Sequence, residues 1–354
     1  MITNPVQPAG NMLKYLQIIF FASVILYAGK TLFIPLFFGL LIAMILYPVC
    51  KWLEQKHFPK SVAITVCLLI VALFFAGIAS LFIWQITMFR EAAPELLKKL
   101  QAAGAEFAQW IAESFGLTSA GWVQQSMGSI GSITKVVVNN MLDTIFMLFL
   151  TPIYTALFLY HRRVFVQFLR WVAGEKHKAK LDLMLPKMID TYFKYIKGMI
   201  LVYIIVGVLN SIGLLALGIE HAILFGMLCA VMTIIPYVGI VVSAVLPISV
   251  AWLSTGSMWY PAGVIAVFAV VQYLEANIIF PKVVGVQLNV STWAMLVAIV
   301  AGGILWGVSG MVLFIPLVAL IKMGTDYTEE WKPLNSLLGR GERRGERREV
   351  KGER

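Results

Sequence analysis

The residues best suited to chemistry in this sequence are three polar side chains within one apolar stretch, residues 261–280. Glu275 is its single acid, Gln272 lies three residues earlier on the same helical face, and Asn277 follows two residues later. A carboxylate at low dielectric can bind and release a proton or a cation. The structural alternative is that Glu275 only hydrogen-bonds to a neighbouring helix or reaches water. We expect Pro281 to end this helix, about 9 Å beyond Glu275.

Two proline–glycine interruptions lie within apolar stretches and resemble one another. Broken helices expose backbone amides and carbonyls, which membrane-embedded proteins tolerate only where the backbone lines protein or a water-filled cavity. Asn210, in another apolar stretch, either lines the same cavity or only bridges helices. We therefore expect a cavity bordered by the interruption residues Pro236, Tyr237, Gly239, Pro281 and Gly285.

A third group of residues indicates packing rather than chemistry. Gly303 and Gly307 are four residues apart and Gly310 follows, a spacing that lets apolar helices approach closely. The four histidines and three cysteines are scattered, with no metal-ligand spacing and no nucleophile motif. The sequence therefore predicts no enzyme, no metal site and no cofactor.

The composition sets the environment in which these residues act. Of 354 residues, 60% are hydrophobic and 13% charged, with a mean hydropathy of +0.85, whereas a soluble domain has about 25% charged residues. The chain is therefore predicted to be an all-α, polytopic integral membrane protein whose principal surroundings are the lipid bilayer. Five apolar stretches are long enough to be spans: residues 15–29 and 31–50, expected to form a tight hairpin, and residues 62–86, 136–160 and 199–217.

The second half of the chain requires broken helices. Residues 222–274 carry no charge, and as one helix they would extend about 80 Å, which no bilayer accommodates. Breaks are expected at residues 236–239 and 254–257. Residues 222–253 and residues 293–321 each form either a kinked span or a re-entrant hairpin.

The location of the charge predicts orientation. The net charge of +10 is concentrated in residues 51–60 (+2), 161–198 (+6) and 322–354 (+2), while residues 87–135 are neutral overall. Short basic segments stay in the cytoplasm, so both termini are predicted to be cytoplasmic and residues 87–135 external. Eight spans satisfy this orientation and are favoured. One crossing by residues 261–280, flanked by two re-entrant hairpins, satisfies it as well.

Residues 1–338 are predicted to form a single transmembrane domain that includes two polar segments. Residues 94–115 form an amphipathic stretch that is either an interfacial helix or an external lid or oligomer contact. The basic segment 161–198 matches an anionic lipid surface, so no nucleic-acid partner is expected. Residues 339–354 are predicted to be a disordered, charged cytoplasmic tail. A homo-oligomer is compatible with the sequence, which leaves the number of subunits open.

Three motifs follow one another along the chain: Ile235-Pro236-Tyr237-Val238-Gly239, Leu274-Glu275-Ala276-Asn277-Ile278-Ile279-Phe280-Pro281 with Gly285, and Gly303-Ile304-Leu305-Trp306-Gly307-Val308-Ser309-Gly310-Met311 with Ile315-Pro316. With these motifs the sequence resembles the autoinducer-2 exporter (AI-2E) family, also called PerM-like permeases, over nearly all of residues 1–338. Ala276 stands where the family often has glycine and Ser309 where it usually has proline, which leaves the subfamily open.

The resemblance implies a multi-pass transporter of the bacterial inner membrane that carries a small molecule or an ion. Some members resemble exporters of autoinducer-2, and others resemble sodium(lithium)/proton antiporters. The absence of a complete phosphate-binding loop agrees with secondary, non-ATP transport. We expect export of a small polar solute, proton-coupled through Glu275. The alternatives are an antiporter and a non-transport membrane scaffold.

Overall fold

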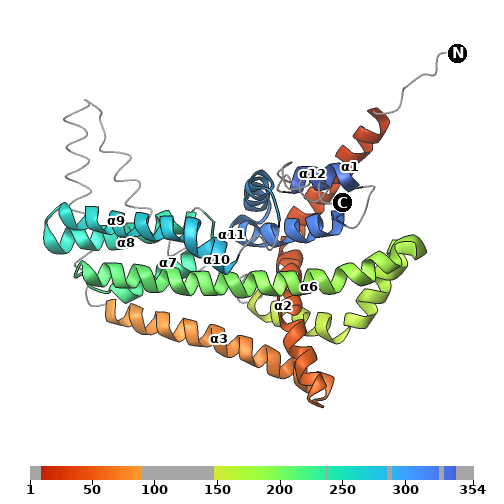
Figure 1. Cartoon of the computed structure of the whole chain (residues 1–354), viewed down its shortest axis with the longest axis horizontal. Helices are drawn as coiled ribbons and strands as arrows, with labels where there is room; N and C mark the ends of the chain where they lie inside the picture. The colour runs from red at the N-terminus through yellow and green to blue at the C-terminus, as the bar shows by residue number, and fades with distance from the viewer. Residues whose placement is uncertain (1–8, 90–146, 237, 285–288, 327–330, 340–354) are drawn as a thin grey trace, which may run out of the picture. The chain divides into compact units, whose positions relative to one another are not determined.

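The computed structural model describes residues 9–89, 147–236, 238–284, 289–326 and 331–339 (Figure 1). Within those ranges the regular structure is helical, and an isolated bridge between Val290 and Gly339 is the sole β feature. The prediction of an all-α protein is confirmed. The helices are α1 (Ala9–Ala28), α2 (Lys30–Gln55), α3 (Lys60–Phe89), an unlabelled helix Met147–Tyr160, α6 (Arg162–Ala216), α7 (Ala222–Met232), α8 (Val238–Thr255), α9 (Trp259–Leu274), the π-helix η1 (Glu275–Ile279), α10 (Phe280–Val283), α11 (Thr292–Thr325) and α12 (Lys332–Leu338).

Five helices are long and apolar enough to cross a membrane, as judged by length and composition. Shorter apolar helices accompany them, and α7 with its 11 residues is only about 16 Å long. The chain is therefore a multi-pass membrane protein. The five candidates are Lys30–Gln55, Lys60–Ser80, His177–Ala216, Trp259–Val283 and Thr292–Thr325.

The chain divides into two compact units. The first comprises Met1–Met44, Met147–Met188 and Leu288–Arg354, and the second comprises Ile45–Phe146 and Ile189–Gln287. Glu275 and Asn210 belong to the second unit, whereas the Gly303–Gly310 motif belongs to the first.

The second unit is built on two antiparallel helix pairs that share α6. Gly198 of α6 faces Val283 and Val284, Gly213 faces Val267, and Leu217 faces Gly263, so α6 and the continuous helix from α9 to α10 run side by side in constant register. On another side of α6, Gly207 faces Ala230 of α7. The helices α7 and α8 pack on each other, as do α8 and α9 (Figure 1).

Buried apolar side chains from α6 to α10 form one core in this unit. Fully buried members include Val202, Leu214, Phe225 and Val264. The turn between α7 and α8 is tight, because a Cβ atom on Gly239 would overlap the carbonyl group of Met232. The expected break at residues 236–239 is present, and it makes α7 and α8 a hairpin.

The long helix α11 of the first unit also folds back on itself. Gly307 has φ 61° and ψ −140°, a conformation that essentially only glycine adopts without strain. Beyond it, Gly310 lies against Gly302 so closely that a Cβ atom on either residue would overlap the other's backbone. The two arms, of 15 and 18 residues, are therefore a hairpin, about 22 and 27 Å long.

The tip and the open end of the α11 hairpin are both fixed by hydrogen bonds. At the tip, Trp306 Nε1 donates to the Leu26 carbonyl at 2.9 Å, and its ring packs against Phe37 and Phe314. At the open end, the Ser291 N–H donates to the Leu338 carbonyl at 2.7 Å. The start of α11 therefore contacts the short helix α12.

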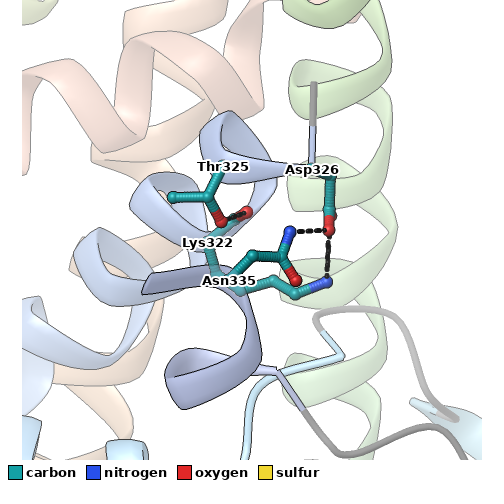
Figure 2. A network of polar contacts seen from close by, with 4 residues as sticks. All are labelled: Lys322, Thr325, Asp326 and Asn335. Carbon is teal, nitrogen blue, oxygen red and sulfur yellow. Dashed lines mark hydrogen bonds and ion pairs between the residues drawn. The ribbon is translucent and has the colours of Figure 1, made fainter. Parts of the chain in front are cut away.

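An ion pair between the buried Lys322 and the exposed Asp326 secures the contact of the other end of α11 with α12 (Figure 2). Lys322 is 3% exposed, and its Nζ lies 2.9 Å from both carboxylate oxygens of Asp326. Asn335 of α12 donates to the same carboxylate at 2.7 Å. Thr325 donates to the Lys322 carbonyl, which caps this end of α11.

Two local expectations are corrected. The hairpin expected between residues 15–29 and 31–50 is absent, because Gly29 continues the helical hydrogen bonds from Ile25 to Phe33. Pro281 does not end its helix, which continues to Val283. Within α6, Gly174 has φ 68° and kinks the helix.

Candidate functional site

Glu275 begins a π-helix, in which each turn holds one more residue than an α-helical turn. The Phe280 N–H donates to the Glu275 carbonyl, five residues earlier. This wide turn accommodates Pro281, which has no N–H and would clash with a carbonyl of a regular α-helix. Because the helix continues to Val283, Glu275 lies about 12 Å from its end. Glu275 therefore lies farther from the end of its helix than the 9 Å expected from the sequence.

The Glu275 side chain is half-buried and incompletely satisfied. Its Oε2 atom is buried and has no hydrogen-bond partner within the described part of the chain. Tyr203 of α6 and Cys229 of α7 lie within electrostatic range of the carboxylate. Buried polar atoms are nearly always paired, and the exceptions call for a functional or structural explanation. π-Turns inside α-helices are themselves frequent at functional sites.

Asn210 lies on the face of α6 that packs against α7, and only 2% of it is exposed. Its Nδ2 donates to the Val206 carbonyl at 3.0 Å and to Cys229 Sγ at 3.5 Å. Its Oδ1 is buried and has no partner among the described residues. Asn210 therefore presents an unpaired acceptor beside the thiol that also lies in range of Glu275.

Two hydroxyl groups complete this cluster around Cys229. Thr233 Oγ1 donates to the Cys229 carbonyl at 2.7 Å, and Ser243 Oγ donates to the Ile240 carbonyl at 3.0 Å. Both hydroxyl groups are hydrogen-bonding neighbours of the Cys229 thiol. Ser243 is fully buried and Cys229 is 1% exposed. We call Asn210, Cys229, Thr233, Ser243 and Glu275 the polar cluster.

The packing registers place the end of α7 and Glu275 at the same level along α6. Cys229 and Ala230 of α7 lie beside residues 207–210 of α6, so the end of α7 lies near residue 205. The register of α6 with α9 puts Glu275 opposite the same part of α6. The predicted cavity between the Pro236 break and Glu275 stays a prediction.

The other predicted residues lie elsewhere. Gln272 is half-buried, and Asn277 is exposed and donates to the Tyr273 carbonyl of its own helix at 2.9 Å. Pro281 is exposed, beyond the π-turn. Gly303, Gly307 and Gly310 form the hairpin of the other unit, and the predicted residues Tyr237 and Gly285 lie outside the described residues, as do residues 94–115 and 340–354.

The sequence interpretation missed Tyr203, Cys229, Thr233 and Ser243. Cys229 and Thr233 are four residues apart and share one face of an otherwise apolar helix, so this pair could have been noticed. Ser243 gave no such signal, because single serines are common in apolar helices. Among the described residues, no three His, Cys, Asp or Glu side chains gather as a metal site.

The fold and the polar cluster define a multi-pass helical membrane protein with a half-buried carboxylate in an apolar helix. Residues 16–330 match the family described as AI-2E family transporter, and the chain belongs to that family. It is 27% identical over 312 residues to "Putative transport protein YrrI" of Bacillus subtilis (strain 168), covering 83% of this chain and 86% of the relative. It is 28% identical over 155 residues to "AI-2 transport protein TqsA" of Escherichia coli (strain K12), covering 44% of each.

Proposed function

We propose that the protein is a secondary transporter of the bacterial inner membrane that exports a small polar solute such as autoinducer-2, with Glu275 as its proton-coupled group. The observation that carries the proposal is the buried, unpartnered Oε2 atom of Glu275 at a π-turn about 12 Å inside a long apolar helix. A carboxylate in a membrane segment is costly in free energy, so its presence there points to a function. The name of the relative TqsA supports autoinducer-2 as the solute to test first.

A topology with two re-entrant hairpins fits this proposal better than eight separate crossings. The basic segment 161–198 is taken as cytoplasmic. In that orientation α6 crosses the membrane from the cytoplasmic to the external face. The α7–α8 hairpin then enters the membrane from the external face and returns to it, and the helix from α9 to α10 crosses back to the cytoplasmic face. The α11 hairpin then starts and ends at the cytoplasmic face. The contacts of both α11 ends with α12 support this arrangement, in which the carboxyl terminus is cytoplasmic.

The proposal is tested by solute efflux from proteoliposomes that contain the full chain. Efflux of autoinducer-2 should accelerate when the outside is made more acidic than the inside. It should return to the leak rate when an ionophore dissipates the pH gradient. Efflux that ignores the gradient would contradict proton coupling, and efflux equal to that of protein-free liposomes would contradict export.

The same carboxylate favours one alternative, a sodium(lithium)/proton antiporter. In that case everted vesicles would release protons when sodium is added without any organic solute.

The third alternative is that the protein is a membrane scaffold that transports nothing. Glu275 variants would keep full function, while deletion of residues 94–115 would abolish it.

A further inference from the structure

We propose that the first arm of α6, residues 162–173, is an interfacial helix that lies in the plane of the membrane and binds anionic phospholipids of the cytoplasmic leaflet. The charge of residues 161–198 predicts attraction to such a surface, and the structure adds an exposed apolar face that fits into it. The inference goes beyond the proposed function and does not involve Glu275.

The first arm is a helix separate from the part of α6 that is long enough to cross the membrane. A bend at His161 divides it from the helix Met147–Tyr160, and the kink at Gly174 divides it from the rest of α6. The candidate span of α6 begins beyond this kink, at His177. The first arm has 12 residues and is about 18 Å long, which is too short to cross about 30 Å of hydrocarbon.

The two arms of α6 are turned toward each other at Gly174. Across the kink, Arg170 Nε donates to Asp182 Oδ1 at 2.7 Å, although the two residues are 12 positions apart. In a continuous helix they would be separated by about 18 Å along the axis. All of these residues belong to the first unit. The first arm therefore leaves the direction of the crossing helix, as a helix in the membrane plane must.

One side of the first arm is apolar, and the described part of the chain leaves it exposed. Trp171 is 80% exposed and Val172 is 61% exposed, and the rings of Phe168 and Trp171 lie 6.4 Å apart. Contiguous apolar surface marks an interaction site, and tryptophan favours the boundary between membrane and water. At about 100° per residue, the exposed apolar side chains cover about 160° of the circumference. They are Val164, Phe165, Phe168, Leu169, Trp171 and Val172.

The charge around this face selects the partner. Residues 162–182 contain six basic and two acidic residues, a net charge of +4. Arg163 and Arg170 are seven positions apart and lie on the side of the helix opposite the apolar face. An anionic leaflet offers hydrocarbon to the apolar face and negative charge to the basic residues. A second copy of the chain would bring the same positive charge to the contact, so repulsion disfavours it.

The test measures the depth of the first arm in the full-length protein, reconstituted into nanodiscs of phosphatidylcholine and phosphatidylglycerol. Val172→Cys and Arg163→Cys are each labelled with the same maleimide fluorophore. Both positions are exposed, and their separation of nine residues places them about 180° apart around the helix. The native cysteines of wild type, all buried, give the labelling background. A nitroxide on the lipid acyl chain, close to the headgroup, quenches a fluorophore that enters the membrane.

The fluorophore at residue 172 should be quenched at least about twofold more strongly than the fluorophore at residue 163. Phe168→Cys lies on the same apolar face, should behave like Val172→Cys, and remains decisive if Val172→Cys fails to fold. Equal quenching on the two sides of the helix would overturn the proposal. Self-quenching between fluorophores of two copies, without quenching by the lipid nitroxide, would assign the face to a second copy and also overturn it.

A second measurement tests the preference for anionic lipid. The composition of the nanodisc is kept constant, and the nitroxide is carried either by phosphatidylglycerol or by phosphatidylcholine. Quenching at residue 172 should be stronger with the nitroxide on phosphatidylglycerol. This difference should shrink at high ionic strength, because salt screens the attraction of the basic residues. Equal quenching by the two lipids at low ionic strength would overturn the assignment of an anionic partner.

Discussion

At the scale of single residues, the unpaired acceptors near Cys229 and the paired lysine near α12 show two ways of placing polar groups in an apolar protein. Asn210 and Glu275 each keep a buried oxygen without a partner among the described residues. Lys322 is equally buried but meets the Asp326 carboxylate, which Asn335 also contacts. The first arrangement leaves binding capacity, whereas the second fixes structure.

The ion pair of Lys322 is expected to stabilise the fold. Asp326→Asn leaves a buried ammonium group without its counter-charge, and we expect it to cost about 1.5–3 kcal/mol of stability. The matched control is Asp190→Asn, which breaks the exposed Lys194–Asp190 pair of the same spacing and should cost about 0.5 kcal/mol or less. Thermal denaturation in detergent measures both, and equal melting temperatures for the two variants would contradict the assignment.

At the scale of elements, the α7–α8 hairpin and the π-turn position the residues of the polar cluster, and the α11 hairpin belongs to the other unit. The break before Gly239 could be predicted, because a charge-free run of such length must bend. The π-turn could not, because a proline in sequence predicts a helix end equally well. The continuity of α1 and α2 was missed because Gly29 and Lys30 together suggest a turn. Backbone hydrogen bonds across Gly29 join α1 to α2 without a reversal of the chain.

The hairpin of α11 depends on Gly307. Gly307→Ala places a Cβ atom at φ 61° and ψ −140° and should destabilise the protein by about 1–3 kcal/mol through backbone strain. Gly77→Ala is the control, because Gly77 lies in helix α3 with open space around its Cβ position. That change should be neutral or stabilising by about 0.5–1 kcal/mol. If Gly307→Ala melts at the wild-type temperature, the hairpin does not require this glycine.

At the scale of the whole molecule, the all-helical membrane class follows from composition, and the arrangement of crossings requires structure. The distribution of charge allows eight crossings, which the sequence favours, and also one crossing flanked by two re-entrant hairpins. The contacts of α12 with both ends of α11 are the observation on which the proposed re-entrant arrangement rests. The polar cluster was likewise only partly predictable. Glu275 and Asn210 stand out as polar residues in apolar helices, but their common neighbour Cys229 does not.

The proposed topology predicts which faces carry accessible residues. Thr292 at the start of α11 and Ser336 in α12 are both exposed. The variants Thr292→Cys and Ser336→Cys should react with a membrane-impermeant maleimide only in inside-out vesicles. Glu220→Cys and Met258→Cys, which flank the α7–α8 hairpin and are exposed, should react only from the external face. The native cysteines of wild type, all buried, give the background. Labelling of either pair from opposite faces would contradict the re-entrant assignment.

The most direct test of the central claim measures proton movement that accompanies solute export in proteoliposomes with a trapped pH-sensitive dye. The comparison is between Glu275→Gln and Glu220→Gln, which remove the same charge from a half-buried helix position and from an exposed turn. We predict that Glu220→Gln moves protons with autoinducer-2 as wild type does, and that Glu275→Gln loses all proton movement coupled to the solute. Proton-coupled export by Glu275→Gln at the wild-type rate would contradict the account.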